Sequence, residues 1–448
     1  MDEETKPTRK AKDNPWYKLA TFHGVPKTAH DEVAAKNRVT WNRWMASRIP
    51  DDLRAALLEK GHTQEELTPF PEDELRAIGS QLGISPAAGI VDFSDTEFEV
   101  LFANRFVFFG AISFVAATFS GDAFFINATF SSSSSRFHNA DFSSAIFSGD
   151  AAFGGATFSS DAVFNWATLR NAGFRNATFS SNAIFSSATF SSNAFFINAT
   201  FGGDAFFIGA TFGRRPAFGG DALFNSATFS GRADFSSARF TRHAVFTNAK
   251  MEGLTAFDHA TFNSPPECSN AKLHEGTTWH DVRWPATPSN VIRARDFLGA
   301  YARLKLEMDR LKKHSDELDF FALEQQCRRA ADGFWKGLPI AIYGFVSDYG
   351  RSYIRPLGLL VATVLAGTII FAAHEAGFWT PLLGYVSKAA GISFANTLSL
   401  LGKPLLSPDV MLYKYTDWLK AVATLQTILG IAFLFLFGLG IRNRFRMK

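Results

Sequence analysis

Polar side chains that could contact an ion lie in two apolar stretches near the C-terminus. The first is GISFANTLSLLGK (391–403), and the second, AVATLQTILGIAFLFLFGLGI (421–441), holds one strongly polar side chain. Hydroxyl and amide groups at a narrow passage can replace part of an ion's hydration shell. The possible pore-lining residues are therefore Ser393, Asn396, Thr397, Ser399 and Gln426. Gln426 is equally suited to bonding a neighbouring helix.

Other groups with the spacing of a chemical site are sparse. His274 and His280 follow Cys268, but their spacing matches no standard set of zinc ligands, so ordinary capping structure is expected there. No phosphate-binding loop, HExxH motif, nucleophile elbow or convincing carboxylate pair occurs. We expect no catalytic, cofactor-binding or metal residue, and we expect that the protein is not an enzyme.

The two apolar stretches that hold the polar residues can each cross a bilayer. Residues 357–373 lack charge over 17 positions and residues 421–441 over 21. A buried helix of a soluble protein is the alternative. We predict a two-span transmembrane domain over 351–448, with a possible re-entrant segment at 391–403 that dips into the membrane and returns.

Basic residues flank both predicted spans on the side away from the connecting segment. Arg351 and Arg355 precede the first span, and Arg442, Arg444, Arg446 and Lys448 follow the second. The positive-inside rule then places the N- and C-termini in the cytoplasm of a multi-pass protein. A charged N-terminus without a signal peptide and the two cysteines agree with a bacterial-type inner or plasma membrane. The segment FVSDYGRSYIRP (345–356) is expected along the inner interface.

Phenylalanine recurs at short, regular intervals in the middle of the chain. The chain has 448 residues and 49 Phe, most of which lie in one tract, as in ATFSSNAIFSSATFSSNAFFINATFGGDAFFIGATF (177–212). The steps between Phe residues mostly alternate between five and six, from Phe119 to Phe262, and Ala usually stands two positions before each Phe. Neither a helical nor a strand period fits this pattern.

A stack of coils accounts for the spacing. If each five- or six-residue unit forms one side, four sides give a coil of about 22 residues. Phe and Ala would point to the interior, and Ser, Gly, Asn, Asp and Thr would turn the corners. Stacked backbones would satisfy each other's hydrogen bonds. The Ser- and Gly-rich composition would also suit a disordered tract, but disorder does not need regular Phe.

The tract resembles the pentapeptide-repeat family, in which Ala, Asp or Asn is followed by Leu or Phe and two variable residues. It departs from that pattern by a sixth residue in alternate units. The resemblance implies a mainly β fold, a right-handed quadrilateral β-helix, over 101–284. Some members are acidic rods that mimic DNA. Here nine acidic residues face nine basic ones between 119 and 262, so no nucleic-acid partner is expected and a scaffold or docking surface for a protein partner is favoured.

Helical segments are expected on both sides of the tract. The region 1–100 reads as mostly helical, with Trp16, Trp41 and Trp44 in helical surroundings and a helix at 71–83. A helical linker is predicted over 285–350, with one helix from a cap at Ser289 or Asn290 to about Lys313 and another from about Asp316 to Ala331.

The order of span, short apolar segment and span resembles the two-helix pore domain of potassium-type channels, although the Thr-Val-Gly-Tyr-Gly-Asp filter is absent. The resemblance implies a pore for an inorganic ion built by a homo-oligomer, a tetramer if four copies surround one axis. Two functions follow: an ion-channel-like pore with a cytoplasmic β-helix as sensor or docking domain, or a membrane-anchored scaffold without conduction. Detergent oligomeric state separates them, because a monomer excludes the pore.

Overall fold

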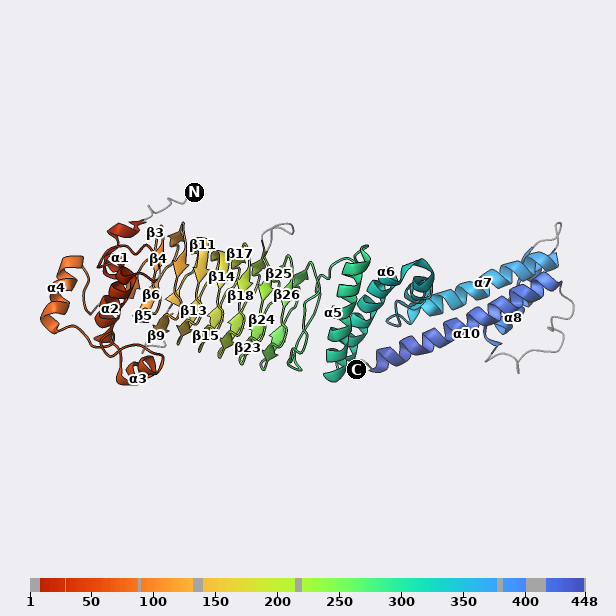
Figure 1. Cartoon of the computed structure of the whole chain (residues 1–448). Helices are drawn as coiled ribbons and strands as arrows, with labels where there is room; N and C mark the ends of the chain where they lie inside the picture. Colours follow the sequence, from red (N-terminus) through yellow and green to blue (C-terminus); the bar gives the residue numbers. More distant parts are fainter. Residues whose placement is uncertain are drawn as a thin grey trace. The chain divides into compact units, whose positions relative to one another are not determined.

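The computed structural model describes residues 9–28, 30–87, 90–131, 140–213, 220–376, 382–399 and 416–446. These residues belong to two compact units, Met1–Ala286 and Thr287–Lys448. The first unit has helices followed by many short strands, and the second unit is helical (Figure 1).

Short parallel strands stack in the first unit. Each strand pairs with the strand one coil further along the chain, so that Phe158 lies opposite Phe179. Within the described residues the strands form three parallel sheets. Neighbours in a sheet are separated in sequence by strands of the other sheets, which is the connectivity of stacked coils. The predicted β-helix-like stack is therefore confirmed.

The strand bounds follow the Phe frame. One sheet contains β2 Ile90–Asp92, β6 Ala111–Ser113, β10 Ala140–Asp141, β13 Ala162–Val163, β16 Ala183–Ile184, β20 Ala205–Phe206, β24 Ala233–Asp234 and β28 Thr255–Ala256. A second contains β5 Val107–Phe109, β9 Thr129–Ser131, β12 Thr157–Phe158, β15 Thr178–Phe179, β19 Thr200–Phe201, β23 Thr228–Phe229 and β27 Lys250–Met251. The third has a main path of β1 Arg9–Lys10, β3 Thr96–Phe98, β7 Thr118–Phe119, β11 Ile146–Ala152, β14 Thr168–Gly173, β17 Thr189–Phe190, β21 Thr211–Phe212, β25 Arg239–Phe240 and β29 Thr261–Phe262. Its side branch is β4 Leu101–Phe102, β8 Ala123–Phe124, β18 Ala194–Phe195, β22 Ala222–Leu223 and β26 Ala244–Val245.

The stack begins at Ile90, upstream of the expected boundary at residue 101. Phe93 and Phe98 already occupy the interior and are almost fully buried. Pairing partners lie about one predicted coil apart, as Thr178 and Thr200 do, 22 residues from each other. Thr200 and Thr228 are 28 residues apart, because the coil between them also contains 214–219.

Columns of aromatic rings fill the interior of the stack. Phe185 is fully buried, and its ring stacks on Phe164 at 4.8 Å and on Phe207 at 5.0 Å between centroids. The rings are spaced like the strands that carry them, about 4.8 Å apart. Ala188 and the other alanines two positions before Phe are also fully buried. The predicted inward placement of Phe and Ala is therefore confirmed.

Corner geometry explains the alternation of fives and sixes. In the five-residue step from Phe185 to Phe190, Ala188 N donates to Phe185 O at 3.1 Å, and Ser187 has a φ of 58°. This is a tight turn whose third residue is left-handed, as in a type II turn. Such positions are mostly Asn, Ser, Asp or Gly, which tolerate this conformation better than larger residues. The six-residue step from Phe179 to Phe185 contains no positive φ angle.

Helix α2 (Glu32–Ala46) covers the first coil of the stack. The ring of Trp41 is fully buried and lies 5.2 Å from both Phe106 and Phe108, between centroids. The neighbouring Asn42 side chain accepts a hydrogen bond from Val107 N at 2.8 Å and donates one to Arg105 O at 3.1 Å. Asn42 thus satisfies edge groups that would otherwise have no strand beside them.

The remaining N-terminal elements complete this cap. Strand β1 pairs in parallel with β3 and extends that sheet by one strand. Asn14 bonds the backbone of Asp92 and caps the helix that follows it, because its side chain also accepts from Trp16 N. The helices are α1 Pro15–Ala20, α2 Glu32–Ala46, α3 Asp51–Glu59 and α4 Glu72–Leu82, with the 3₁₀ helix η1 Ala11–Asp13 before them. The helix expected at 71–83 is confirmed as α4.

The other end of the stack carries larger rings. Trp279 stacks on Phe257 at 4.4 Å, and Trp284 stacks on Phe262 at 5.5 Å, between centroids. Indoles thus continue two Phe columns after regular strand pairing has given way to isolated bridges such as that between Thr261 and Arg283.

The second unit begins with a helical hairpin. Helix α5 spans Val291–Arg310 and is capped by Asn290, as predicted. Helix α6 spans His314–Ser347 but is interrupted at Gly333, whose φ of 77° and ψ of −177° are not helical. Its first half therefore ends close to the expected Ala331, and a second helical half, which was not predicted, follows the kink. Leu304, Met308, Phe320 and Cys327 are buried in the hairpin.

Two long apolar helices follow the hairpin, with shorter helices between them. They are α7 Ile354–Ala376, η2 Leu382–Tyr385, α8 Val386–Thr397 and α10 Asp417–Arg446. Among the described residues α7 and α10 are the two helices long and apolar enough to cross a bilayer, with mean hydropathies of 2.2 and 2.1 in their most apolar windows. This supports a membrane association, on length and composition.

Candidate functional site

Helix α8 packs against both long apolar helices. Phe371 and Ala372 of α7, Ile392 of α8, and Leu419 and Ala423 of α10 form one buried cluster. The short helix therefore belongs to a three-helix unit within one chain, and its Ser393 and Thr397 side chains are buried there.

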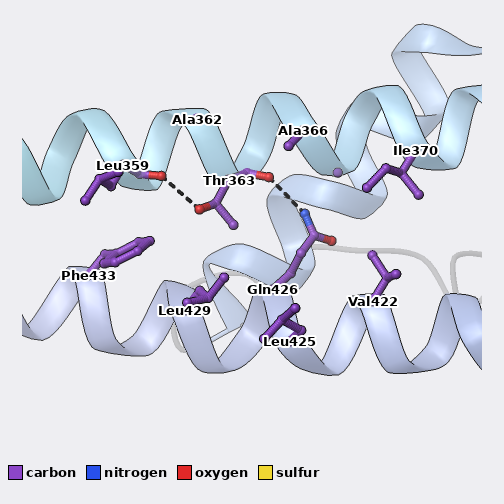
Figure 2. A pocket seen from close by; sticks show the side chains of 11 residues that line it. Leu359, Ala362, Thr363, Ala366, Ile370, Val422, Leu425, Gln426, Leu429 and Phe433 are labelled. Carbon is purple, nitrogen blue, oxygen red and sulfur yellow. Dashed lines mark hydrogen bonds between the residues drawn. The ribbon is translucent and has the colours of Figure 1, made fainter. Parts of the chain in front are cut away.

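Gln426 is the centre of the polar contacts in this unit. Its Nε2 donates to Ser393 Oγ at 2.8 Å and to Thr363 O at 3.1 Å, and Figure 2 shows the second of these bonds. Ser393 Oγ in turn donates to Val364 O at 2.7 Å. One side chain from each of α8 and α10 thus links all three helices. Interhelical hydrogen bonds of this kind stabilise membrane bundles modestly.

Two glycines make room for these contacts. A Cβ on Gly367 of α7 would overlap Nε2 of Gln426 and Oγ of Ser393. A Cβ on Gly430 of α10 would overlap the carbonyl group of Thr397. Small residues let helices approach closely in membranes. The bonds of Gln426 therefore depend on an absent side chain on the facing helix.

A second polar contact joins the C-terminal end of α8 to α10. Thr427 Oγ1 donates to Asn396 O at 3.0 Å and is also within bonding distance of Ala423 O in its own helix. In this three-helix unit, three buried polar atoms have no hydrogen-bond partner among the described residues: Gln426 Oε1, Asn396 Nδ2 and Thr397 Oγ1. Buried groups of this kind are candidates for contacts with water, an ion or another chain.

An apolar groove of about 370 Å³ lies between α7 and α10. Figure 2 shows Ala362, Thr363 and Ala366 on one side and Gln426, Leu429 and Phe433 on the other. Apart from Thr363 and Gln426, whose bonds join the helices, its lining is apolar. The groove can hold an acyl chain or a neighbouring helix, and it offers few groups to a hydrated ion.

The five residues predicted to line a pore have different surroundings. Ser393, Thr397 and Gln426 are buried in the three-helix unit, and Asn396 bonds Thr427 through its backbone. Ser399 is half-buried two residues beyond the end of α8. Residues 400–403 of the predicted re-entrant segment lie outside the described residues. Thr363, Gly367, Thr427 and Gly430 were missed, because small and hydroxyl residues are ordinary in apolar helices.

His280 and His274, near the end of the stack, each contact a neighbouring group. His280 contacts Asp258, with 3.1 Å between Nδ1 and Oδ1, and His274 Nδ1 accepts from Gly276 N at 2.8 Å. Partial burial alone would raise the pKa of Asp258. The hydrogen bond from His280 N and the nearby His280 imidazole outweigh this effect and lower the pKa of Asp258. These contacts are local capping interactions.

One group in the described part of the chain has the composition of a metal site. Asp309, His314 and Glu317 place ligand atoms within 4.8 Å of one another at the turn between α5 and α6. His314 already contacts Glu317, with 3.1 Å between Nδ1 and Oε2. The N-terminus of α6 favours this carboxylate and disfavours a cation, so the group reads as a local hydrogen-bonded contact at the start of the helix.

Ion pairs stand where α6 gives way to α7. Arg351 contacts Asp319 at 3.1 Å and Asp348 at 3.0 Å, and Arg355 lies 3.6 Å from Asp348. Partial burial opposes the charge on Arg351, but the two carboxylates outweigh it and raise its pKa. The basic residues expected at this boundary are thus fixed partly by protein carboxylates.

The comparisons with known proteins concern the stack. A family model described as Pentapeptide repeats (9 copies) matches residues 142–189 and 214–261. The chain matches no curated protein and no solved structure. No match supports the resemblance of the C-terminal segment to a potassium-type channel pore. Within the tract that builds the parallel stack, these two stretches are therefore similar to pentapeptide repeats.

Proposed function

We propose that the protein is a membrane-anchored scaffold, in which α7 and α10 hold a rigid pentapeptide-repeat β-helix at a bilayer. One observation carries this proposal: the two helices turn most of their apolar surface outward. The chain buries only 33% of the most apolar 18-residue stretch of α7 and 17% of the most apolar 18-residue stretch of α10. Exposed side chains include Leu365, Ile369 and Phe435. Exposing such large apolar surfaces to water is unfavourable, whereas lipid chains can cover them.

The orientation rests on the basic residues at the helix ends. Arg351 and Arg355 lie at the start of α7, and Arg442 and Arg444 lie near the end of α10. Both helix ends would face the cytoplasm of a bacterial-type inner or plasma membrane in a multi-pass arrangement with cytoplasmic termini. The β-helix would then stand in the cytoplasm.

The β-helix would serve as a binding surface for a protein partner. Its successive strands β16, β17, β18 and β19 are followed by β20, which pairs with β16. This order supports four sides in each coil, and we infer the right-handed quadrilateral form typical of pentapeptide repeats. Its balanced charge disfavours nucleic acid. A scaffold of this kind needs no catalytic group.

Membrane retention tests the anchor. Vesicles containing the protein are washed at high pH and floated on a gradient, and the wild type is expected to float. A variant with Val361, Leu365 and Ile369 changed to Lys replaces three exposed apolar side chains of α7 and should lose retention. Changing exposed Ser226, Ser230 and Glu252 of the β-helix to Lys is the control and should leave flotation unchanged. Release of the wild type by the wash would overturn the proposal.

An ion pore is the second candidate, and one observation favours it. Asn396 and Thr397 carry buried polar atoms without a partner among the described residues, and α8, which bears them, lies in sequence between two apolar helices. In a homo-oligomer, a tetramer if four copies surround one axis, these groups and Ser399 could face an inorganic ion. Ser393 and Gln426 are already used in helix contacts, so a pore would depend less on them.

Current across a planar bilayer separates the two functions. Discrete currents from the purified protein, altered in size or selectivity by Asn396→Ala with Thr397→Ala, would support a pore. A folded protein that floats with vesicles, runs as a monomer in detergent and passes no current would leave the scaffold. Thr424→Val is the matched control, because the hydrogen bond from Thr424 Oγ1 to Lys420 O stays within α10.

A further inference from the structure

The second half of α6 exposes a continuous row of large apolar side chains. Trp335 is 81% exposed, Phe345 is 74% exposed and Phe334 is 72% exposed. Leu338 and Ile342 are exposed between them. At 3.6 residues per turn, these positions fall within an arc of about 100°, which is the width of an amphipathic face.

The kink at Gly333 separates this face from the packed half of the helix. Before the kink, Phe320 and Cys327 are buried in the hairpin with α5. After it, Gly337 lies close to the backbone of Arg329, and Val346 and Ser347 are buried. The opposite side of this half-helix is therefore held by the chain, while its aromatic side is left uncovered.

This exposed face ends at a turn that precedes the start of α7 and contacts the end of α10. The turn after α6 is tied together by Ser352 N, which donates to Ser347 O at 3.0 Å, and α7 begins at Ile354. Asn443, near the end of α10, donates to Gly350 O of the same turn at 3.1 Å. The start of one proposed span and the end of the other thus meet at the turn that terminates the exposed face.

Basic residues lie near both ends of the exposed face. Lys336 is exposed and follows Trp335 in sequence near the kink, and Arg442 and Arg444 are exposed at the end of α10, next to Asn443, which bonds the turn. Tryptophan and phenylalanine with neighbouring Lys and Arg are the composition of helices that lie in the headgroup region of a bilayer. Anionic headgroups would complement these charges.

We propose that residues 334–345 form an interfacial helix, which buries Phe334, Trp335 and Phe345 in the bilayer surface from which the two spans descend. The occupant of this face is lipid, because the face is continuous with the membrane boundary set by α7 and α10. This inference rests on the proposed membrane anchor. It adds a third membrane contact that lies along the surface rather than across it.

Tryptophan quenching in proteoliposomes tests the helix. The fluorescence of Trp335 is obtained as the difference between the wild type and Trp335→Phe, which keeps an aromatic apolar side chain. In vesicles of phosphatidylcholine and phosphatidylglycerol with brominated acyl chains, this component should lose most of its intensity. Aqueous acrylamide should quench it weakly.

Two matched variants interpret the result. Trp166→Phe reports an exposed indole of the β-helix, 65% exposed, and its component should be quenched by acrylamide and not by bromine. Trp418→Phe reports the start of α10, 53% exposed, and its component should be quenched by bromine. Quenching of the Trp335 component by acrylamide alone, or by neither agent because protein covers it, overturns the inference. If bromine still quenches Trp418, the anchor stands; if it quenches neither, the anchor fails too.

Discussion

The side-chain amide of Gln426 donates to Ser393 Oγ over 2.8 Å, and this bond joins α10 to the short helix α8. Because the same nitrogen also bonds Thr363 O of α7, one carboxamide fastens three helices. A glutamine in an apolar helix can serve a pore or a helix contact, and its donors here serve the contact.

Replacing Gln426 should loosen the three-helix unit. Gln426→Met keeps the length of the side chain and removes both donated bonds. We expect the unfolding free energy in detergent to fall by about 0.5–2 kcal/mol, the range for interhelical bonds in membranes. Thermal or denaturant unfolding followed by circular dichroism measures the change. Thr424→Val should change it little, and an equal effect of the two variants would contradict the assignment.

Gly367 should tolerate no side chain, whereas Gly358 on the same helix should. A Cβ at Gly367 meets Gln426 and Ser393, but a Cβ at Gly358 meets nothing within 4 Å. Gly367→Ala is expected to destabilise the unit by about 1–3 kcal/mol through overpacking. Gly358→Ala should be neutral or slightly stabilising, because alanine favours helix. Melting in detergent compares them, and equal melting temperatures would count against the close contact of α7 with α10.

Asn42 should contribute more to the free energy of unfolding than its surface neighbours, because it covers the backbone edge of the first coil. Asn42→Ala leaves Val107 N and Arg105 O without that side chain, and we expect a loss of about 2–3 kcal/mol. Urea unfolding followed by tryptophan fluorescence measures it. Asn104→Ala is the control, since Asn104 accepts an exposed bond from Ile126 N. An unchanged free energy of unfolding in Asn42→Ala would contradict this prediction and leave the cap to its other contacts, such as that of Trp41 with Phe106.

The cap should weaken in acid through Glu66. Burial disfavours the ionised form of this carboxylate, but the hydrogen bond from His62 and the charge of Arg38 outweigh burial and hold its pKa at about 2, below the ordinary 4.5. A pKa lowered by folding gives stability that is complete above the unfolded value and is lost as pH falls from about 4.5 through about 2.

Urea unfolding at several pH values follows this loss. Glu66→Gln should lower stability near neutral pH and flatten the acid slope. Glu65→Gln, at an exposed neighbouring position, should keep the slope of the wild type. An unchanged slope in Glu66→Gln would assign the acid sensitivity to other carboxylates.

Phe185 should contribute far more to stability than Phe195. Phe185 stacks between two rings inside the stack, so Phe185→Ala opens a cavity and should cost about 3–5 kcal/mol. Phe195 is half-buried outside the core, with the Arg175 guanidinium 4.5 Å from its ring centroid. Phe195→Ala should cost less than half as much. Denaturant unfolding of both variants tests the inward frame, and similar losses would contradict it.

The stack was predictable because its cause is local. The spacing from Phe119 to Phe262 predicts the coils, and the interior positions of Phe and Ala follow from it. The start at Ile90 was missed, because Phe93 and Phe98 stand in the frame without the usual alanines. Strand β1 is a charged Arg-Lys pair, and nothing in such a pair signals a strand.

The partners of the helical side chains depend on tertiary structure and could not be predicted, although a helix contact was one of the two roles expected of Gln426. The sequence singled out Gln426 and Ser393 but not their mutual bond, since that bond depends on Gly367 of a third helix. Gly333 reads as a helix end because glycine favours left-handed backbone, yet α6 restarts beyond it. The outward Trp335 face became visible only with that restart.

The regular pairing makes the length of the β-helix a stepwise quantity. Thr178 pairs with Thr200 as Thr157 pairs with Thr178, so each coil adds the same rise of about 4.8 Å to the stack. If one whole coil is lost or duplicated, every remaining Phe ring still stacks on a ring of the next coil. If half a coil is lost, each side of a coil stacks on a different side of the next coil. Between the α2 cap and the terminal indoles, the stack can therefore be shortened or lengthened only by whole coils.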